Sequence, residues 1–195
     1  MENPMRFALA ALIVAGLATP ALAQQYPPPG ERLLMNPPAG WAAVPVQKGE
    51  KMSITRLFPP GEDDKNWNEL ITVQVYTAHD QSPRTFIDSV IQYSRDNCEA
   101  AGASAVTEVP TNGYPMAVVS VTCTKGRKSG MGGFVLVQAI RGREALYVVQ
   151  RQWRGHPFAK DQTPPFPDGL LRRWSEFSHQ VSLCDTRDNR YPCPK

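Results

Sequence analysis

The sequence lacks an apolar run long enough to cross a membrane. Its longest run, Phe7–Leu17, has eleven residues, whereas a helix needs about 20 apolar residues to cross ~30 Å of hydrocarbon. Arg6 precedes the run, and the small residues of Ala21-Leu22-Ala23 follow it. This arrangement is typical of a secretory signal peptide. We therefore expect residues 1–23 to be a signal peptide, no transmembrane segment, and a periplasmic or secreted mature protein.

The chain also has little net charge. A formal charge of +3 over 195 residues is smaller than nucleic-acid-binding domains carry on a concentrated basic face. The composition, 42% hydrophobic and 20% charged, is that of an ordinary globular protein. We expect one domain over residues 47–183. A proline-rich extended lead-in over residues 24–46 precedes it, and a tail over residues 184–195 follows it.

The four cysteines lack the spacing of a metal site. They form no C-x-x-C pair and have no neighbouring histidine, so a zinc site is not expected. In an exported protein an even number of cysteines indicates disulfides. Three pairings are possible, and we favour the one that closes the shortest loops: Cys98–Cys123 and Cys184–Cys193. The second of these would close the tail.

Motifs for catalysis are missing as well. The sequence has neither H-E-x-x-H nor G-x-S-x-G nor Ser-x-x-Lys, so we assign no catalytic residue and no cofactor. His156 could be a general base beside Asp161, although a loop histidine is more often solvated. A hydrolase-like enzyme with a dispersed site stays an alternative. So does an inhibitor of a secreted enzyme, with Gly126–Gly133 or Cys184–Cys193 as its protruding loop.

Two segments resemble ligand-binding loops without matching them. Gly126–Gly133 is rich in glycine, but a phosphate loop leads into a helix, and a strand pattern follows here. Gly61–Glu69 gathers acidic and amide oxygens around Trp67, but it lacks the spacing and the glycine of a calcium-binding EF-hand. We therefore interpret the first as a hairpin loop and the second as a polar turn with Trp67 against the hydrophobic layer.

Alternation and turn residues predict an α+β fold with an antiparallel sheet of about six strands. A helix follows the second strand, where Ser82 and Pro83 mark its start and a stripe through Phe86, Val90 and Tyr93 its buried face. A second helix begins near Asp168. Gly142-Arg143 predicts a two-residue turn that places Phe134 opposite Arg151. The expected strands are Met52–Phe58, Leu70–Thr77, Ala105–Val109, Ala117–Thr124, Phe134–Arg141 and Ala145–Trp153.

Several short stretches resemble a known superfamily. These are Pro38-Ala39-Gly40-Trp41, Gly61-Glu62 with Trp67, Thr72-Val73-Gln74-Val75 and Tyr147-Val148-Val149-Gln150. Together with the element order, they resemble the α/β/α sandwich of the PsbP-like superfamily and small exported bacterial proteins of unknown function. The resemblance implies this fold over most of residues 40–181. It also implies an accessory or binding role instead of catalysis, and it transfers no site residue.

One group of residues predicts a binding site. In an antiparallel meander consecutive turns lie at opposite ends of the sheet, so a loop and a strand end bring five basic residues together beside Trp153 and Met131. We therefore expect an exported, non-enzymatic binding protein of the bacterial envelope, whose partner is another envelope protein or an anionic molecule. The five residues are Lys125, Arg127, Lys128, Arg151 and Arg154.

Overall fold

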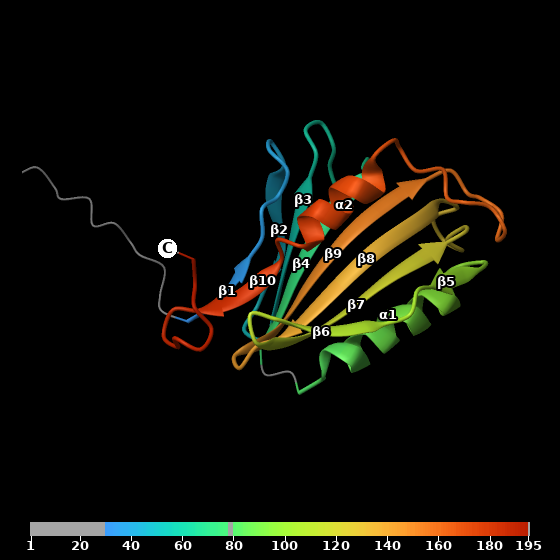
Figure 1. Cartoon of the computed structure of the whole chain (residues 1–195). Helices are drawn as coiled ribbons and strands as arrows, with labels where there is room; N and C mark the ends of the chain where they lie inside the picture. Colours follow the sequence, from blue (N-terminus) through green and yellow to red (C-terminus); the bar gives the residue numbers. More distant parts are fainter. Residues whose placement is uncertain (1–29, 78–79, 195) are drawn as a thin grey trace, which may run out of the picture.

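The protein is built on one antiparallel sheet with a helix on each side (Figure 1). A computed structural model describes residues 30–77 and 80–194, so the expected signal peptide lies outside the described residues. The α+β class is confirmed. Within the described residues, neither helix has the length and apolar content needed to cross a membrane. The elements are β1 (Glu31–Leu34), β2 (Ala42–Lys48), β3 (Met52–Phe58), β4 (Glu69–Thr77), α1 (Pro83–Asn97), β5 (Ala101–Ala103), β6 (Thr107–Thr111), β7 (Tyr114–Cys123), β8 (Gly132–Arg141), β9 (Ala145–Gly155), α2 (Leu170–Ser178) and β10 (Ser182–Asp185).

The main sheet has the strand order β2-β3-β4-β9-β8-β7-β5, and β6 also pairs with β7. Sequence analysis expects about six strands, and that count is wrong for the described residues, because β1, β2, β5 and β10 are strands as well. β1 and β2 lie in the stretch expected as a lead-in. β10 lies at the start of the tail and pairs with β1 in a separate two-stranded ribbon.

α1 covers one face of the sheet at its β7–β8 side. Ser82 caps the helix by accepting a hydrogen bond from the Thr85 N–H at 3.1 Å, and Pro83 occupies the first turn, where no N–H is needed. Phe86 and Ile87 are buried against the sheet. The strand residues of their cluster are alanines and branched aliphatic residues: Ala117, Val119, Val121, Val137, Ala139, Leu146 and Val148.

α2 and the β1–β10 ribbon cover the opposite face (Figure 1). Trp174 and Phe177 of α2 are buried there, as is Leu183 of β10. The strands contribute Leu57, Ile71, Ile140, Tyr147 and Val149 to this core. Because residues two apart on a strand share a face, the register assigns each side chain of β8 and β9 to the α1 face or the α2 face.

Both expected disulfides are present. Cys98–Cys123 joins the end of α1 to the end of β7, and Cys184–Cys193 closes the tail onto β10. Among the described residues no free cysteine is found. Two disulfides are typical of proteins in an oxidising, extracytoplasmic environment.

The register of β8 and β9 differs from the expected one. Gly142 N donates to Ala145 O at 2.9 Å, so the turn residues are Arg143 and Glu144, and Phe134 lies opposite Trp153 instead of Arg151. The Glu31 carboxylate of β1 accepts hydrogen bonds from the Arg143 and Glu144 N–H groups. A residue more than 100 positions away in the chain therefore stabilises this turn.

Candidate functional site

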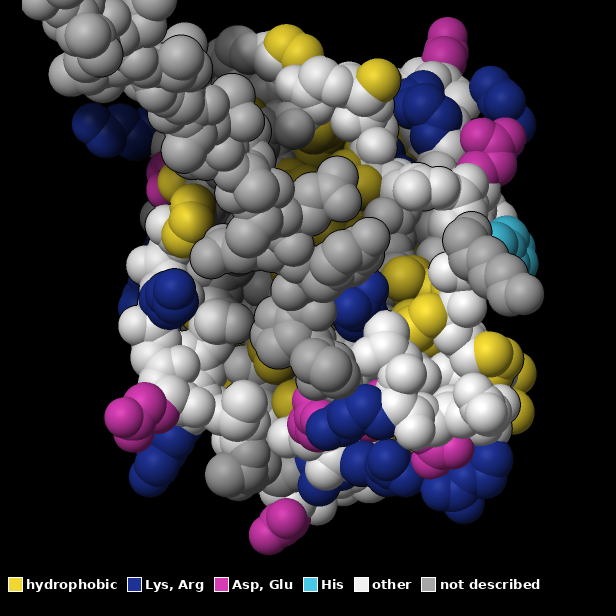
Figure 2. All heavy atoms as spheres, turned by 90° about the vertical axis from the view of Figure 1, so that its left-hand side faces the viewer, with side chains coloured by type: hydrophobic (Ala, Val, Ile, Leu, Met, Phe, Trp, Pro, Cys, Tyr) yellow, Lys and Arg dark blue, Asp and Glu magenta, His cyan; other side chains and the backbone are white. Residues whose placement is uncertain are grey.

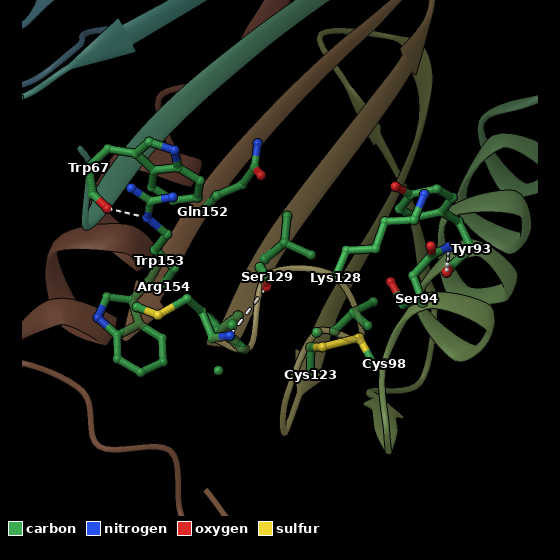
Figure 3. Close-up of a pocket in the computed structure, with 18 residues that line it drawn as sticks. Trp67, Tyr93, Ser94, Cys98, Cys123, Lys128, Ser129, Gln152, Trp153 and Arg154 are labelled. Atoms are coloured by element: carbon green, nitrogen blue, oxygen red, sulfur yellow. Dashed lines mark hydrogen bonds between the residues drawn. A yellow bond between two sulfur atoms is a disulfide. The ribbon is translucent and has the colours of Figure 1, made fainter. Parts of the chain in front are cut away.

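A pocket of about 420 Å³ lies on the α1 face of the sheet, at the end where β9 finishes (Figure 3). Its volume is in the range of about 300–1,000 Å³ that is usual for small-molecule sites. Its walls are the C-terminal half of α1, the β7–β8 loop, and Trp67 with Arg154. The lining includes Trp67, Tyr93, Lys128, Gln152, Arg154 and the Cys98–Cys123 disulfide.

The strand register produces the floor of the pocket. Cys123 of β7, Gly133 of β8 and Arg154 of β9 lie side by side across the sheet on the α1 face. Gly133 has no side chain to fill the space beneath α1. A hollow therefore remains between the disulfide on one side and the Arg154 side chain on the other. The next row along the same face consists of Val121, Val135 and Gln152.

α1 provides one wall through residues about one turn apart. Tyr93 and Asn97 both line the pocket, as i, i+4 neighbours on one side of a helix. Tyr93 is 69% exposed, whereas sequence analysis expects it on the buried stripe with Phe86 and Val90. The difference follows from the floor, since beneath this part of α1 the sheet carries glycine and the disulfide.

The β7–β8 loop forms a second wall and is fixed by its own backbone. Gly126 N donates to Met131 O, Gly130 N donates to Gly126 O, and Arg127 N reaches across to Asn97 O of α1, each at 2.8 Å. Gly130 has a φ of +69°, which favours glycine. The glycines therefore allow a tight hairpin loop held against α1. As expected, no helix follows the loop.

Trp67 and Arg154 form the third wall. The Arg154 guanidinium lies 4.3 Å from the centre of the Trp67 ring, and it donates to the carbonyls of Trp67 and Lys65. The segment before β4 is shaped by Glu62, whose carboxylate accepts from the N–H groups of Asn68 and Glu69. Trp67, expected against the hydrophobic layer, is instead half-buried at the edge of the pocket.

The acidic oxygens of this segment are occupied by hydrogen bonds within the chain. Asp63 Oδ1 accepts from Lys65 N and Asn66 N at 2.9 and 2.8 Å, and Asp64 pairs with Arg56. No group of three potential metal ligands among His, Cys, Asp and Glu occurs in the described part of the chain. The segment is thus a polar turn.

The electrostatics of the pocket are one-sided. Its described lining contains Lys128 and Arg154 but no Asp, Glu or His. Neither cation forms an ion pair with a carboxylate of residues 30–77 or 80–194. Lys128 extends from its loop toward Tyr93, on the side away from Arg154 (Figure 3). Two unneutralised positive charges therefore border one hollow.

Another face of the molecule has a different arrangement of charges. Along the lower edge of the face in Figure 2, Lys or Arg side chains lie directly beside Asp or Glu side chains. Arg187 of the tail and Arg143 of the β8–β9 turn pair with the buried carboxylate of Asp185, and Arg190 pairs with Asp188. Opposite charges in contact neutralise each other, so the charges of these arginines are already compensated by carboxylates of the protein itself.

The other three predicted basic residues do not line the pocket. Lys125 pairs with Glu99 at 2.8 Å, and Arg127 is exposed outside the lining. Arg151 points to the opposite face, because it lies three residues from Arg154 on one strand and side chains alternate between faces. The structure therefore brings only Lys128 and Arg154 together at the site.

Arg151 is part of the core beneath α2, with a side chain only 3% exposed. Its guanidinium donates to Arg173 O at 3.1 Å and to Glu69 Oε2 at 3.5 Å, and it lies 5.4 Å from the Trp174 ring centre and 5.2 Å from that of Phe177. Burial lowers the Arg151 pKa, and the Glu69 carboxylate opposes that shift. Arg151 is therefore a buried core residue on the opposite face of the sheet, and it does not reach the pocket.

The possible general base His156 is not at the site. His156 and Asp161 are exposed, and neither lines the pocket. The lining does contain two serine hydroxyls besides the phenol of Tyr93, but both serines make local hydrogen bonds. Ser94 Oγ donates to Val90 O, and Ser129 Oγ accepts from Met131 N.

Sequence reasoning overlooked Tyr93 and Gln152 as pocket residues. The available signal was Gly133, which lies opposite Arg154 at the end of β9 and leaves space on the face that Tyr93 and Gln152 share. In comparisons with known proteins, no family model matches this chain, and no curated protein sequence matches it either.

Proposed function

We propose that this protein is an exported binding protein of the bacterial envelope that holds an anionic molecule in the pocket beneath α1. The observation that carries the proposal is the pair Lys128 and Arg154, whose charges border a pocket that has no acidic residue in its described lining. Charge complementarity of this kind selects partners of opposite sign.

The character of the lining supports binding instead of catalysis. A general base or nucleophile must lie within hydrogen-bond reach of the reacting group, and the described lining offers cations, aromatic side chains, amides, one disulfide and two serine hydroxyls that are already engaged. The resemblance to PsbP-like proteins, which are mostly accessory or binding proteins, favours the same reading. The two disulfides and the signal-peptide pattern support export.

The test uses 8-anilinonaphthalene-1-sulfonate, a fluorescent anion with an apolar body, as the probe. Lys128→Met should weaken its binding about fivefold, since an exposed charge contributes on the order of 1 kcal/mol. Lys128→Met with Arg154→Met should weaken it further. Binding by the wild type should also weaken as salt screens the charges.

The matched control is Lys160→Met. Lys160 is exposed and lies outside the pocket, so its loss should leave probe affinity unchanged. Circular dichroism and thermal unfolding show whether each variant keeps the wild-type fold. If the double variant and the Lys160→Met control bind the probe with equal affinity, the proposal that this pocket binds an anion is wrong.

A further inference from the structure

The floor of the pocket continues beyond it as an open strip of polar side chains. On β9, Arg154, Gln152 and Gln150 alternate with residues of the α2 face, and Thr72 and Gln74 of β4 lie beside them on the same side. α1 packs mainly on β7, β8 and β5, so within the described residues it does not lie over the glutamines of the strip, although Thr72 is itself buried. Gln74, Gln150 and Gln152 are partly exposed.

Hydrogen bonds between the side chains hold the strip in one arrangement. Gln152 Nε2 donates to Thr72 Oγ1 at 2.9 Å, and Gln150 Nε2 donates to Gln74 Oε1 at 3.0 Å. A side-chain amide carries two N–H donors and a carbonyl with two acceptor positions. After these bonds, the Gln74 NH₂ group and the Gln150 carbonyl oxygen still have capacity for a ligand. The strip therefore offers a ligand both a hydrogen-bond donor and an acceptor.

This chemistry fits a ligand with many hydroxyl groups. A hydroxyl donates and accepts at once, so it matches fixed amides, which an acyl chain does not. Tyr93 at the pocket provides an exposed aromatic surface for the apolar side of a sugar ring, whereas one face of the Trp67 ring is covered by Arg154. From Arg154 to Gln150 the strand advances roughly 13 Å at ~3.3 Å per residue, which exceeds one sugar ring.

We infer that the ligand is an acidic oligosaccharide, whose carboxylates lie at the two cations bordering the pocket, Arg154 and Lys128, and whose following sugar units lie along Gln152, Gln150 and Gln74. The inference rests on the proposed function, since the same pocket holds the charged end. It adds a ligand class and a second contact region outside the pocket.

Isothermal titration calorimetry with three probes tests it: trigalacturonate, galacturonate and uncharged maltotriose. Trigalacturonate should bind the wild type at least about tenfold more tightly than galacturonate, because hydrogen bonds on the strip contribute on the order of 1 kcal/mol each. Maltotriose should bind more weakly than trigalacturonate by a similar factor. Galacturonate binding as tightly as trigalacturonate, or maltotriose doing so, overturns the inference.

Two variants separate the strip from the pocket. Gln74→Leu with Gln150→Leu should lose about tenfold in trigalacturonate affinity and keep the wild-type affinity for 8-anilinonaphthalene-1-sulfonate. Gln74→Glu, a single change to a residue of similar size, should weaken trigalacturonate by charge repulsion and gives the answer if the double variant fails to fold. Lys160→Met is again the control.

The outcomes distinguish the two proposals. If the sulfonate probe binds through Lys128 and Arg154 but trigalacturonate does not bind, or binds the strip variants as it binds the wild type, the saccharide inference is wrong and the anion pocket stands. If neither probe depends on Lys128 and Arg154, both proposals are wrong.

Discussion

Replacing Glu69 with glutamine should destabilise the protein through the buried Arg151. The Glu69 carboxylate, 17% exposed, contacts the Arg151 guanidinium at 3.5 Å and accepts the Trp174 indole N–H at 3.0 Å. At an effective dielectric constant of 20, two charges at this separation attract by roughly 5 kcal/mol before desolvation is subtracted. Removing one partner of a buried pair costs about 3–5 kcal/mol. Because Glu69 borders solvent, we expect a loss of about 3 kcal/mol.

Urea denaturation at neutral pH under oxidising conditions measures this loss as a lower free energy of unfolding. Arg151→Met should cost less, since it removes the buried charge itself and leaves Glu69 with Arg173 and Trp174. The double variant should be close to Arg151→Met alone, because the carboxylate then has no buried cation to neutralise.

The matched control is Glu176→Gln, at an exposed i, i+4 pair with Arg172, which should change the free energy of unfolding by under about 0.5 kcal/mol. A Glu69→Gln cost below about 1 kcal/mol would refute the reasoning. The reasoning would also be refuted if the cost of the double variant equalled the sum of the costs of Glu69→Gln and Arg151→Met, because additive costs indicate independent sites.

Three more predictions concern stability. The Tyr114 hydroxyl is buried and makes no hydrogen bond among the described residues, although burial and the nearby Glu31 carboxylate raise its pKa. The Tyr147 hydroxyl donates to that carboxylate. In urea denaturation Tyr147→Phe should cost about 1 kcal/mol and Tyr114→Phe should cost less, and equal costs would contradict this. The Asp188 pKa is lowered, mainly by side-chain hydrogen bonds from Arg190, so its stabilisation is complete above the ordinary pKa near 4 and is lost as pH falls through the lowered value. The melting-temperature gap between wild type and Asp188→Asn should therefore narrow in acid, and a gap independent of pH would count against it. Replacing Cys98 and Cys123 with serine should cost about 3.5 kcal/mol for a sequence separation of 25, and a loss under about 1 kcal/mol in urea denaturation would argue against the loop-entropy account.

Local signals in the sequence were sufficient for α1 and for six strands of the sheet. The cap at Ser82 and the proline after it depend on neighbouring residues alone, and so does the alternation in β7–β9. β2 gave no such signal, because every residue of Ala42–Lys48 is exposed and Pro45 interrupts the pattern. Its place in the sheet comes from pairing with β3.

The candidate site was predicted in part, because some of its residues are placed by local signals and others by contacts between distant parts of the chain. Lys128 and Arg154 follow from hairpin connectivity, which the sequence does indicate. The error over Arg151 came from counting residues at one end of the sheet without separating the two faces. The turn between β8 and β9 could not be placed by its own residues, since Glu31 supplies two of its hydrogen bonds.

The pairing of β1 with β10 sets a limit on when the protein can finish folding. The two strands are joined residue by residue, Glu31 with Asp185 and Leu34 with Ser182, and Gly30 bonds to Thr186 across 156 positions. While the chain is still being synthesised or translocated, β1 has no partner until nearly all of the described residues have emerged. Contacts this distant in sequence slow folding. A chaperone that shields β1 would therefore have to stay bound during most of the synthesis or translocation of this chain.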